Sequence, residues 1–450
     1  MDYLEDRESC PTMAVIGAGP KAIAIAAKVD ALRRSGLQVP NLIVIEKQGV
    51  AAHWTGAYGY TNGTQTLGTP AEKDVGFPYY GGSWDADGPL VVTNTLRDSW
   101  QGYLVGCGHF ADWVDRGRPR PTHRQWAAYL RWVAENIKLK LLAATVTRID
   151  IVDARWVLTC RNELDATTAM LASDGLAITG TGPPRTVPGQ VADHLRVLDG
   201  RNFWQHTGRL AALPSPVSVC VIGTGETAAS IAVELLRVLK SGSTVEVVTP
   251  QGVLYSRGES FFENQLYSNP LPEWPHLAES HRREFLNRTD RGVFSVQAEQ
   301  ALNSAPGCLR TLAGRVTRLE VREAEVLVYI SYQHERECAA YDSVVVAIGF
   351  DPVWFEPLLS NSARMALRNA TGIGPDTGIT ANDLERIEFD LGVENLHPRL
   401  HLPMLAGLAQ GPGFPNLSCL GLMADRILQP YVNEGRYGLV QRREAVFERR

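Results

Sequence analysis

Residues 13–29 read MAVIGAGPKAIAIAAKV, and this stretch decides the fold. Its first four residues form a short run with β-branched side chains, which is typical of a buried strand. Gly17 and Gly19 then supply a tight turn, and the remainder has the apolar spacing of a helix. Residues 42–46, LIVIE, predict a second buried strand that ends in Glu46. The order strand, glycine turn, helix and strand predicts a βαβ unit.

Residues 217–228 repeat this pattern as VSVCVIGTGETA, and a helical stretch and the strand-like segment TVEVVTP at 244–250 follow. In such units the first glycine makes the turn, and the second lets the backbone approach a pyrophosphate at the N-terminus of the helix. Both copies have alanine at the third glycine position, which still permits close packing of helix on strand. Two correctly placed copies predict two separate dinucleotide sites.

Two dinucleotide sites in one chain favour a flavin that is reduced by a nicotinamide, because hydride transfer needs the two rings in contact. The stretches DGLAITGTG at 174–182 and DSVVVAIGF at 342–350 each predict a buried strand that ends in glycine, where the chain can cross close to a bound nucleotide. We therefore expect an α/β protein with two Rossmann-like domains, one for FAD and one for NADPH.

The two domains are predicted to be interleaved along the chain. We expect the FAD-binding domain to comprise residues 1–200 and 340–450, and the NADPH-binding domain to be inserted at 201–339. Within the insert, residues 255–306 carry aromatic and charged side chains with little strand signal. We expect this segment to be small and mainly helical.

The composition excludes several functional classes. The 450 residues contain 44 Lys and Arg against 49 Asp and Glu, so nothing favours a nucleic-acid partner. Neither a signal-peptide pattern nor an apolar run of membrane-spanning length is present, so we expect a soluble cytoplasmic protein. The seven cysteines contain no C-x-x-C pair and the histidines are scattered, so we expect reduced thiols and no metal site.

Two related classes of flavoprotein fit less well. The missing dithiol argues against a disulfide reductase of the thioredoxin-reductase type. A Baeyer–Villiger or flavin-containing monooxygenase should carry F-x-G-x-x-x-H-x-x-x-W between the glycine turns, whereas residues 202–206 read NFWQH without that glycine.

Further motifs follow in a recognisable order: EKDVGFPY at 72–79, RGESFFEN at 257–264, TDRGVFS at 289–295 and QGPGFPNLSCLGL at 410–422. With them, the chain from about Thr12 to Leu428 resembles the flavin-dependent N-hydroxylating monooxygenases. It is most similar to the lysine N6-monooxygenases of mycobactin and nocobactin synthesis.

The resemblance implies roles for individual residues. For FAD it implies Gly17, Gly19 and Pro20 at the pyrophosphate, Glu46 at the ribose, and His53, Trp54 and the C-terminal loop residue Gly413 near the flavin. For NADPH it implies Gly223, Gly225, Glu226 and Thr227 at the second pyrophosphate turn. For the substrate it implies that Lys73 holds the carboxylate, that Asn264 grips the amino acid, and that Ser418 lies where the C-terminal loop meets flavin and substrate. Through Asn264, it also implies that the segment 255–306 contacts substrate.

The sequence departs from the family at three places. Gly68 stands where the family usually has a glutamine, and we expect Gln65 to supply that hydrogen bond to the flavin. An asparagine that helps to hold the nicotinamide is absent from residues 289–295. No arginine directly follows the second strand, so Arg257 is the nearest partner for a 2′-phosphate, and NADH stays open beside NADPH.

The implied activity is that of an NADPH-dependent L-lysine N6-monooxygenase. NADPH would reduce FAD, molecular oxygen would add to give a C4a-hydroperoxyflavin, and the neutral side-chain amine would take the distal oxygen to form N6-hydroxylysine for hydroxamate siderophores. Because the lysine amine has a pKa of about 10.4 in water, the site must favour its neutral form and exclude water. No side chain is expected to act as a general acid or base.

Several alternatives remain open from the sequence. The chain could be an L-ornithine N5-hydroxylase, another flavin monooxygenase, or a flavin-binding regulatory protein with impaired catalysis. The lysine could be free, acylated or bound to a carrier. A homo-oligomer and a functional link to siderophore assembly enzymes are also expected from the resemblance.

Overall fold

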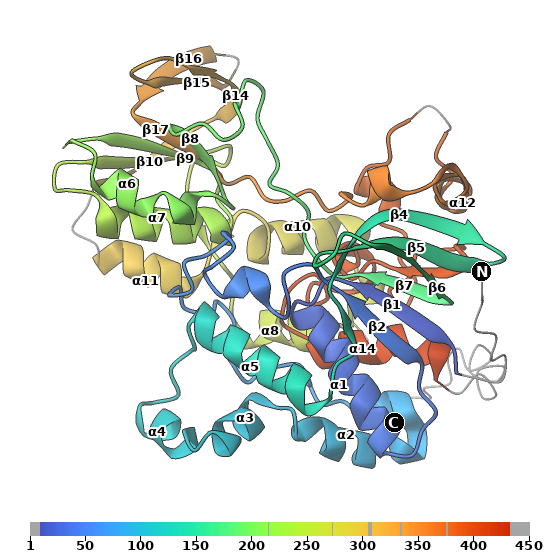
Figure 1. Ribbon diagram of the computed structural model, residues 1–450. Coiled ribbons are helices and arrows are strands. Elements are labelled where there is room, and N and C mark those ends of the chain that lie inside the picture. The colour runs from blue at the N-terminus through green and yellow to red at the C-terminus, as the bar shows by residue number, and fades with distance from the viewer. Residues whose placement is uncertain are drawn as a thin grey trace.

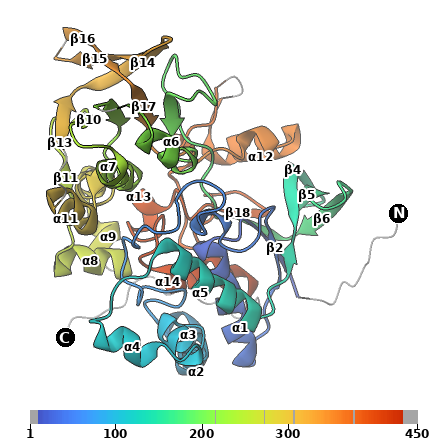
Figure 2. The same ribbon diagram turned by 60° about the vertical axis from the view of Figure 1, so that its left-hand side comes forward.

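The computed structural model describes residues 10–432, apart from 215, 272, 305–307, 334 and 375–376. Two α/β domains are visible, each built on a parallel sheet (Figures 1 and 2). Both domains have the same design, because each sheet carries helices on one side and a three-stranded antiparallel meander on the other. The expected α/β class with two Rossmann-like units is therefore confirmed.

The first domain is organised around a five-stranded parallel sheet. Its strands, in spatial order, are β18 (Arg399–His401), β7 (Gly175–Ile178), β1 (Thr12–Ile16), β2 (Asn41–Ile45) and β3 (Leu141–Leu142). Figure 1 shows α1 (Pro20–Arg34) and α14 (Leu420–Leu428) together on one side of this sheet. The meander on the other side consists of β4 (Ala144–Val152), β5 (Arg155–Asn162) and β6 (Thr168–Ser173).

The second domain repeats this arrangement. Its sheet has the order β13 (Cys308–Ala313), β10 (Thr244–Thr249), β9 (Ser218–Ile222), β17 (Ser343–Val346) and β8 (Val197–Asp199). Along β9, Val219 and Val221 pack with residues of α7 (Glu226–Val238), whereas Cys220 and Ile222 pack with the meander. That meander consists of β14 (Arg315–Val321), β15 (Val326–Tyr332) and β16 (Glu335–Tyr341). Both faces of the sheet are buried, which explains the continuous apolar runs in the sequence.

The remaining elements connect and cover the two domains. The helices are α2 (Gly88–Leu96), α3 (Trp100–Gly106), α4 (Phe110–Asp115), α5 (His123–Asn136), α6 (Thr207–Ala211), α8 (Phe261–Ser268), α9 (Glu273–His276), α10 (Glu279–Thr289), α11 (Val296–Ser304), α12 (Asn361–Thr371) and α13 (Gly407–Gln410). The short strands β11 (Tyr255–Ser256) and β12 (Val293–Phe294) pair in parallel. The 3-10 turns are η1 (Ala52–Trp54), η2 (Gly82–Asp87), η3 (Phe203–Gln205), η4 (Glu356–Leu358), η5 (Asn382–Leu384) and η6 (Gln429–Tyr431).

Local sequence signals explain where the helices α5 and α8 begin. The N-cap of α5 is Thr122, which forms a capping box with Gln125. Helix α8 begins in the same way, with Ser260 and Glu263 as the reciprocal pair. The segment 255–306 is mainly helical, as expected, and Trp274 of α9 packs with Leu408 of α13. The segment is thereby tied to the C-terminal part of the first domain.

The sheets require a correction to the expected domain boundaries. Residues up to 200 and from 340 onward were expected in the first domain, yet β8 and β17 pair in the second sheet. A short buried strand has the same apolar character in either parallel sheet, so its sequence does not specify which sheet it joins. The boundaries therefore lie before β8 and after β17.

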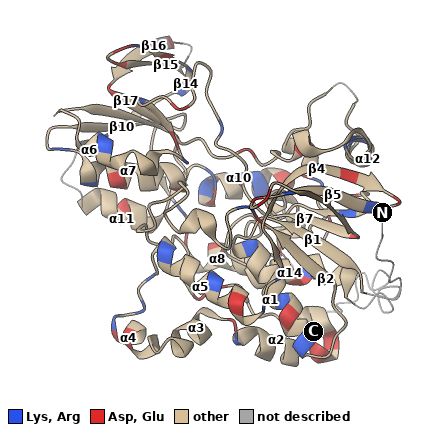
Figure 3. Ribbon diagram, in the orientation of Figure 1, with Lys and Arg blue, Asp and Glu red and all other residues tan. Residues whose placement is uncertain are grey.

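Charged residues of both signs are spread over the two domains (Figure 3). Helix α1 is buried along most of its length, although it contains Lys21, Lys28 and Asp30. The Lys28 Nζ lies 2.9 Å from the Asp425 carboxylate of α14, and both side chains are almost completely buried. Within the described residues, no helix combines the length and the apolar character needed to cross a bilayer.

Candidate active site

The first glycine turn has the geometry of a phosphate cradle. Gly17 has φ 97°, and a Cβ there would lie 3.1 Å from Thr179 Oγ1. A Cβ on Gly19 would meet nothing within 4 Å, so the backbone at this position is open to an approaching group. Gly19 caps α1 without a side-chain hydrogen bond, which leaves N–H groups of the first turn available to an anion. The turn fits the pyrophosphate of FAD.

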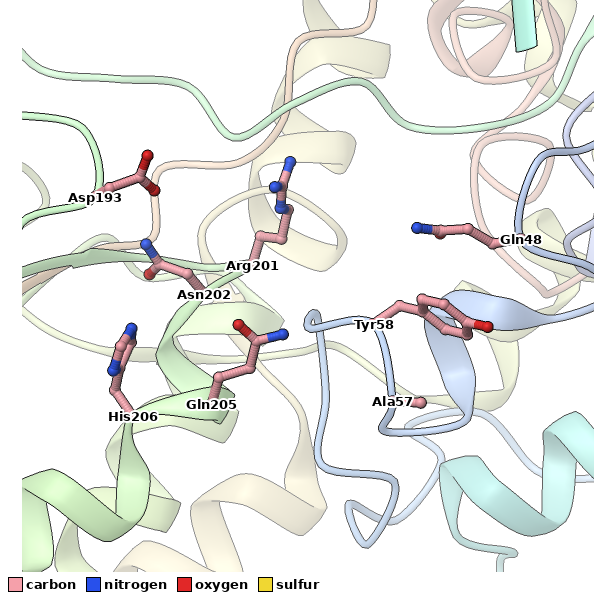
Figure 4. A pocket seen from close by; sticks show the side chains of 8 residues that line it. All are labelled: Gln48, Ala57, Tyr58, Asp193, Arg201, Asn202, Gln205 and His206. Carbon is pink, nitrogen blue, oxygen red and sulfur yellow. The ribbon is translucent and has the colours of Figure 1, made fainter. Parts of the chain in front are cut away.

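Glu46 lies beside this turn at the end of β2. Its carboxylate accepts hydrogen bonds from the backbone N–H of Ala18 at 3.4 Å and of Gln48 at 2.9 Å. A polar cleft of about 480 Å³ opens next to Gln48 (Figure 4). The cleft is lined by Gln48, Ala57, Tyr58, Asp193, Arg201, Asn202, Gln205 and His206. Gln48 lines this cleft two residues after Glu46, and the contact of Glu46 with the FAD ribose remains a prediction.

Substitution of Gly17 by alanine is expected to weaken FAD binding by about 5- to 150-fold, because the turn would move out of its FAD-binding geometry to relieve a strain of about 1–3 kcal/mol from the positive φ and the contact with Thr179. FAD affinity can be measured by titrating the apoprotein and following flavin fluorescence. The control is Gly36→Ala, which has a similar φ of 85° but open space around its Cβ. That variant should lose stability without losing FAD affinity, and equal FAD affinities in both variants would contradict the assignment.

The segment predicted beside the flavin is held by aromatic contacts. His53 stacks on Tyr60 with ring centroids 4.1 Å apart, and Trp54 packs edge-on against His123 at 4.8 Å. The Gln65 side-chain oxygen accepts hydrogen bonds from Thr61 and from the backbone of its own loop. Gln65 could therefore offer only its amide nitrogen to a flavin, and its role as a substitute for the family's glutamine remains a prediction.

Burial lowers the pKa of His123 to about 4, compared with about 6.5 in an unfolded chain. The unfolded state then binds more protons between these two values, so the folded state should lose stability as the pH falls through this range. Urea unfolding at about pH 7.5 and about pH 5 checks this expectation. The variant His123→Gln should lose less stability than the wild type, and an identical loss in both proteins would contradict it.

The second glycine turn has the same design. Gly223 has φ 127°, and a Cβ there would overlap the Ala347 carbonyl oxygen, whereas a Cβ on Gly225 would meet nothing within 4 Å. The Glu226 carboxylate accepts hydrogen bonds from Ser295 N at 3.0 Å and from Ser295 Oγ at 2.9 Å. Glu226 therefore joins α7 to the start of α11, while the glycine backbone offers the cradle for a pyrophosphate.

The structure gives less direct evidence for the other two residues predicted at NADPH, Thr227 and Arg257. Thr227 lies against Gly200, because a Cβ on that glycine would come within 2.9 Å of Thr227 Cγ2. The Arg257 guanidinium lies 4.0 Å from the Asp290 carboxylate, and its charge contributes to lowering the pKa of Lys73. Arg257 therefore lies near the predicted substrate residues, and its contact with a 2′-phosphate remains a prediction.

Lys73 and Asn264 meet although they are far apart in the chain. Lys73 Nζ donates a hydrogen bond to Asn264 Oδ1 at 3.1 Å. The Asn264 amide nitrogen donates to the Glu259 carbonyl at 2.8 Å, so the orientation of the amide is fixed. Burial is the main cause that lowers the pKa of Lys73. A substrate carboxylate would relieve this unfavourable environment, because it would stabilise the ammonium form.

Residues 411–419, here called the C-terminal loop, close the same region. The Ser418 N–H donates to Asn416 Oδ1 at 2.8 Å, and Gly413 lies so close to Tyr267 of α8 that a Cβ would overlap its carbonyl oxygen. Directly after the loop, the N–H of Gly421 in α14 donates to the carbonyl of Phe77 at 2.7 Å, which joins the start of this helix to the segment that carries Lys73. Burial raises the pKa of the neighbouring Cys419 to about 12, which disfavours the thiolate that a nucleophile would need.

Three charged residues near this site were not singled out by sequence reasoning. Arg120 donates to the carbonyl of Gly68 at 2.5 Å and lies 3.9 Å from the Glu259 carboxylate. Lys21 is buried beneath the C-terminal loop and donates to two of its carbonyls. The sequence contained a signal for a special role of Lys21, because a cation is unfavourable in the first turn of a helix.

Comparison with known proteins decides the family. Residues 94–305 match the model of the L-lysine 6-monooxygenase/L-ornithine 5-monooxygenase family. The chain is 44% identical over 423 residues to the L-lysine N6-monooxygenase MbtG of Mycobacterium sp. (strain MCS), covering 93% of this chain and 94% of that protein. This chain belongs to the lysine and ornithine monooxygenase family. The resemblance read from the sequence is thereby confirmed.

Solved structures of the family share the architecture. The lysine monooxygenase NbtG from Nocardia farcinica is 39% identical, has a TM-score of 0.80, and is matched over 93% of this chain and 100% of its own. The ornithine N-hydroxylase of Kutzneria sp. 744, solved with reduced FAD, NADP+ and L-ornithine, is 16% identical. It has a TM-score of 0.73, with 93% of this chain and 98% of that chain covered. At 16% identity, the similarity to the Kutzneria protein shows a shared fold only.

Proposed function

We propose that this member of the family hydroxylates the side-chain amine of free L-lysine to N6-hydroxylysine, with FAD, NADPH and molecular oxygen. The observation that carries the proposal is the contact of Lys73 with Asn264 beside the C-terminal loop. An ammonium and an oriented amide together suit the carboxylate and amine of an amino acid. The identity of 44% with a protein named as an L-lysine N6-monooxygenase supports lysine over ornithine.

The chain's own residues would bind and orient the substrate. Lys73 would pair with the carboxylate, and the Asn264 Oδ1 that now accepts from Lys73 would become available to the α-amine of the substrate. This anchoring would point the terminal amine away from Lys73 and toward the loop that contains Ser418. FAD, when bound at the first glycine turn, supplies the oxygen-activating chemistry.

The same residues would also favour the neutral form of the substrate amine. The site is closed by Gly413 against α8 and by the buried residues Ser418 and Cys419. Burial lowers the pKa of Lys73 there, as expected where the surroundings disfavour a cation. A substrate amine in these surroundings would lose its proton more readily than in water, and the exclusion of water would limit wasteful release of hydrogen peroxide.

A comparison of substrates tests this proposal. Purified protein with FAD is supplied with L-lysine, L-ornithine or N6-acetyl-lysine, and with NADPH or NADH, and hydroxylated product is measured. We expect product from L-lysine with NADPH, less from ornithine, and none from the acylated amine, which is no longer nucleophilic. Oxidation of NADPH without N-hydroxylated product would favour a flavoprotein with impaired catalysis and would overturn the proposal.

We also propose a cellular context. The product would be used for a hydroxamate siderophore by assembly enzymes in the cytoplasm, and the chain would form a homo-oligomer. Support comes from the resemblance to lysine hydroxylases of siderophore synthesis. Light scattering of the purified protein tests the oligomer, and loss of hydroxamate secretion after deletion of the gene tests the pathway.

A further inference from the structure

Lys21 is a buried cation that no proposed step of the reaction uses. It occupies the first turn of α1, directly after the Gly19 and Pro20 of the cofactor turn, and is only 5% exposed. Its ammonium donates to the carbonyls of Pro415 at 2.8 Å and Asn416 at 2.9 Å. These two hydrogen bonds join the cofactor turn to the C-terminal loop, whose bonded residues lie 394 and 395 positions later in the chain.

This placement is energetically unfavourable for a lysine. The positive end of the helix dipole lies at the same end of α1, and burial lowers the pKa of Lys21 to about 8. Within the described residues, Lys21 forms no ion pair within 4.0 Å. An apolar residue would avoid these costs, but it would leave two partly buried carbonyls without their donor.

One of the two carbonyls belongs to Asn416, whose side chain forms hydrogen bonds within the loop. The Asn416 side chain accepts from the N–H of Ser418 at 2.8 Å and donates to the carbonyl of Pro412 at 2.9 Å. Lys21 fixes the backbone of Asn416, and Asn416 in turn fixes the loop on both sides. A displacement of Lys21 would therefore be transmitted to Ser418, the residue predicted at the flavin and the substrate.

A second buried lysine on the same helix makes a useful contrast. Lys28 forms an ion pair with Asp425 and so joins two regular helices, α1 and α14. Lys21 instead donates to a loop whose residues 411–419 include no helix or strand. Packing of helices accounts for Lys28, whereas Lys21 acts on irregular backbone beside the predicted active site.

We propose that Lys21 is a positioning residue that locks the C-terminal loop onto the cofactor turn and so holds Ser418 in place for hydroxylation. This inference rests on the proposed function for its catalytic consequence, although the locking of the loop does not depend on the substrate. Loss of the lock would let water reach the flavin, so that more reduced cofactor would be consumed for each hydroxylated lysine.

The test compares Lys21→Met, Lys21→Arg and the double variant Lys28→Met/Asp425→Asn with the wild type. Hydrogen exchange of peptides that cover residues 407–419 reports on the loop without any turnover. We expect amide exchange in Lys21→Met to be at least about tenfold faster, because opening of the loop becomes more frequent. The ratio of N6-hydroxylysine to oxidised NADPH should fall at least about twofold, and Lys21→Arg should restore part of both values.

The double variant should melt at a lower temperature but keep the exchange of the loop and the product ratio of the wild type. Wild-type exchange and product ratio in Lys21→Met would overturn the inference, as would equal changes in the double variant. If Lys21→Met does not fold, Lys21→Gln takes its place, and exchange should increase from the wild type through Arg to Gln. If the wild type makes no N6-hydroxylysine, the proposed function fails, while the exchange data still decide the role of Lys21.

Discussion

Replacement of Lys73 by methionine is expected to lower kcat/KM for L-lysine by about 10²- to 10³-fold. The ammonium that contacts Asn264 at 3.1 Å would be lost, and the carboxylate of the substrate would enter a partly buried site without a cationic partner. Oxidation of NADPH in the absence of lysine should change little, because Lys73 is not part of either glycine turn. Steady-state measurement of N6-hydroxylysine checks the effect.

The substrate provides the control for this variant. Pentane-1,5-diamine has the same terminal amine as lysine but no carboxylate, so its turnover should be nearly the same in the wild type and in Lys73→Met. For L-lysine, the kcat/KM of Lys73→Arg should lie between those of the wild type and Lys73→Met, because the charge is kept and the geometry is altered. An equal loss for the diamine and for L-lysine would show that Lys73 acts on something other than the carboxylate.

Substitution of Asp425 by alanine should lower the free energy of unfolding by about 3–5 kcal/mol. Lys28 would remain as an uncompensated charge between α1 and α14, and the Trp84 indole N–H, which donates to Asp425 at 2.7 Å, would lose its acceptor. Urea unfolding of the FAD-loaded protein measures the change.

The matched control for Asp425 is an ion pair on the surface. Asp112 and Arg116 lie 3.9 Å apart with side chains 72% and 74% exposed. Substitution of Asp112 by alanine should cost less than about 1 kcal/mol, because solvent screens such a pair. A cost for Asp425→Ala as small as this would mean that the buried pair contributes little to joining the two helices.

Much of the fold could be predicted from the sequence because both glycine turns carry a backbone requirement. A positive φ at Gly17 and Gly223 demands glycine, and the apolar runs before each turn demand a buried strand. The position of the domain boundary could not be predicted in the same way. β8 and β17 are short and apolar, and only pairing in three dimensions decides which sheet they join.

The substrate residues were predicted from a resemblance, and the structure gives a physical reason to group them. Lys73 and Asn264 have no local signal that relates them, yet they form a hydrogen bond. The contacts of Lys21 with distant residues could not be predicted for the same reason. Nothing near Lys21 in the sequence shows that its ammonium meets Pro415 and Asn416, since those contacts exist only after both ends of the first domain have folded together.

The most direct test of the central claim is a reaction of the FAD-loaded protein with L-lysine, NADPH and isotopically labelled oxygen gas. Mass spectrometry of the product then shows whether an atom from oxygen gas has been transferred to the side-chain amine. We predict N6-hydroxylysine that carries the label, at high yield in the wild type and at low yield in Lys73→Met. Labelled hydrogen peroxide without labelled N6-hydroxylysine would contradict the account.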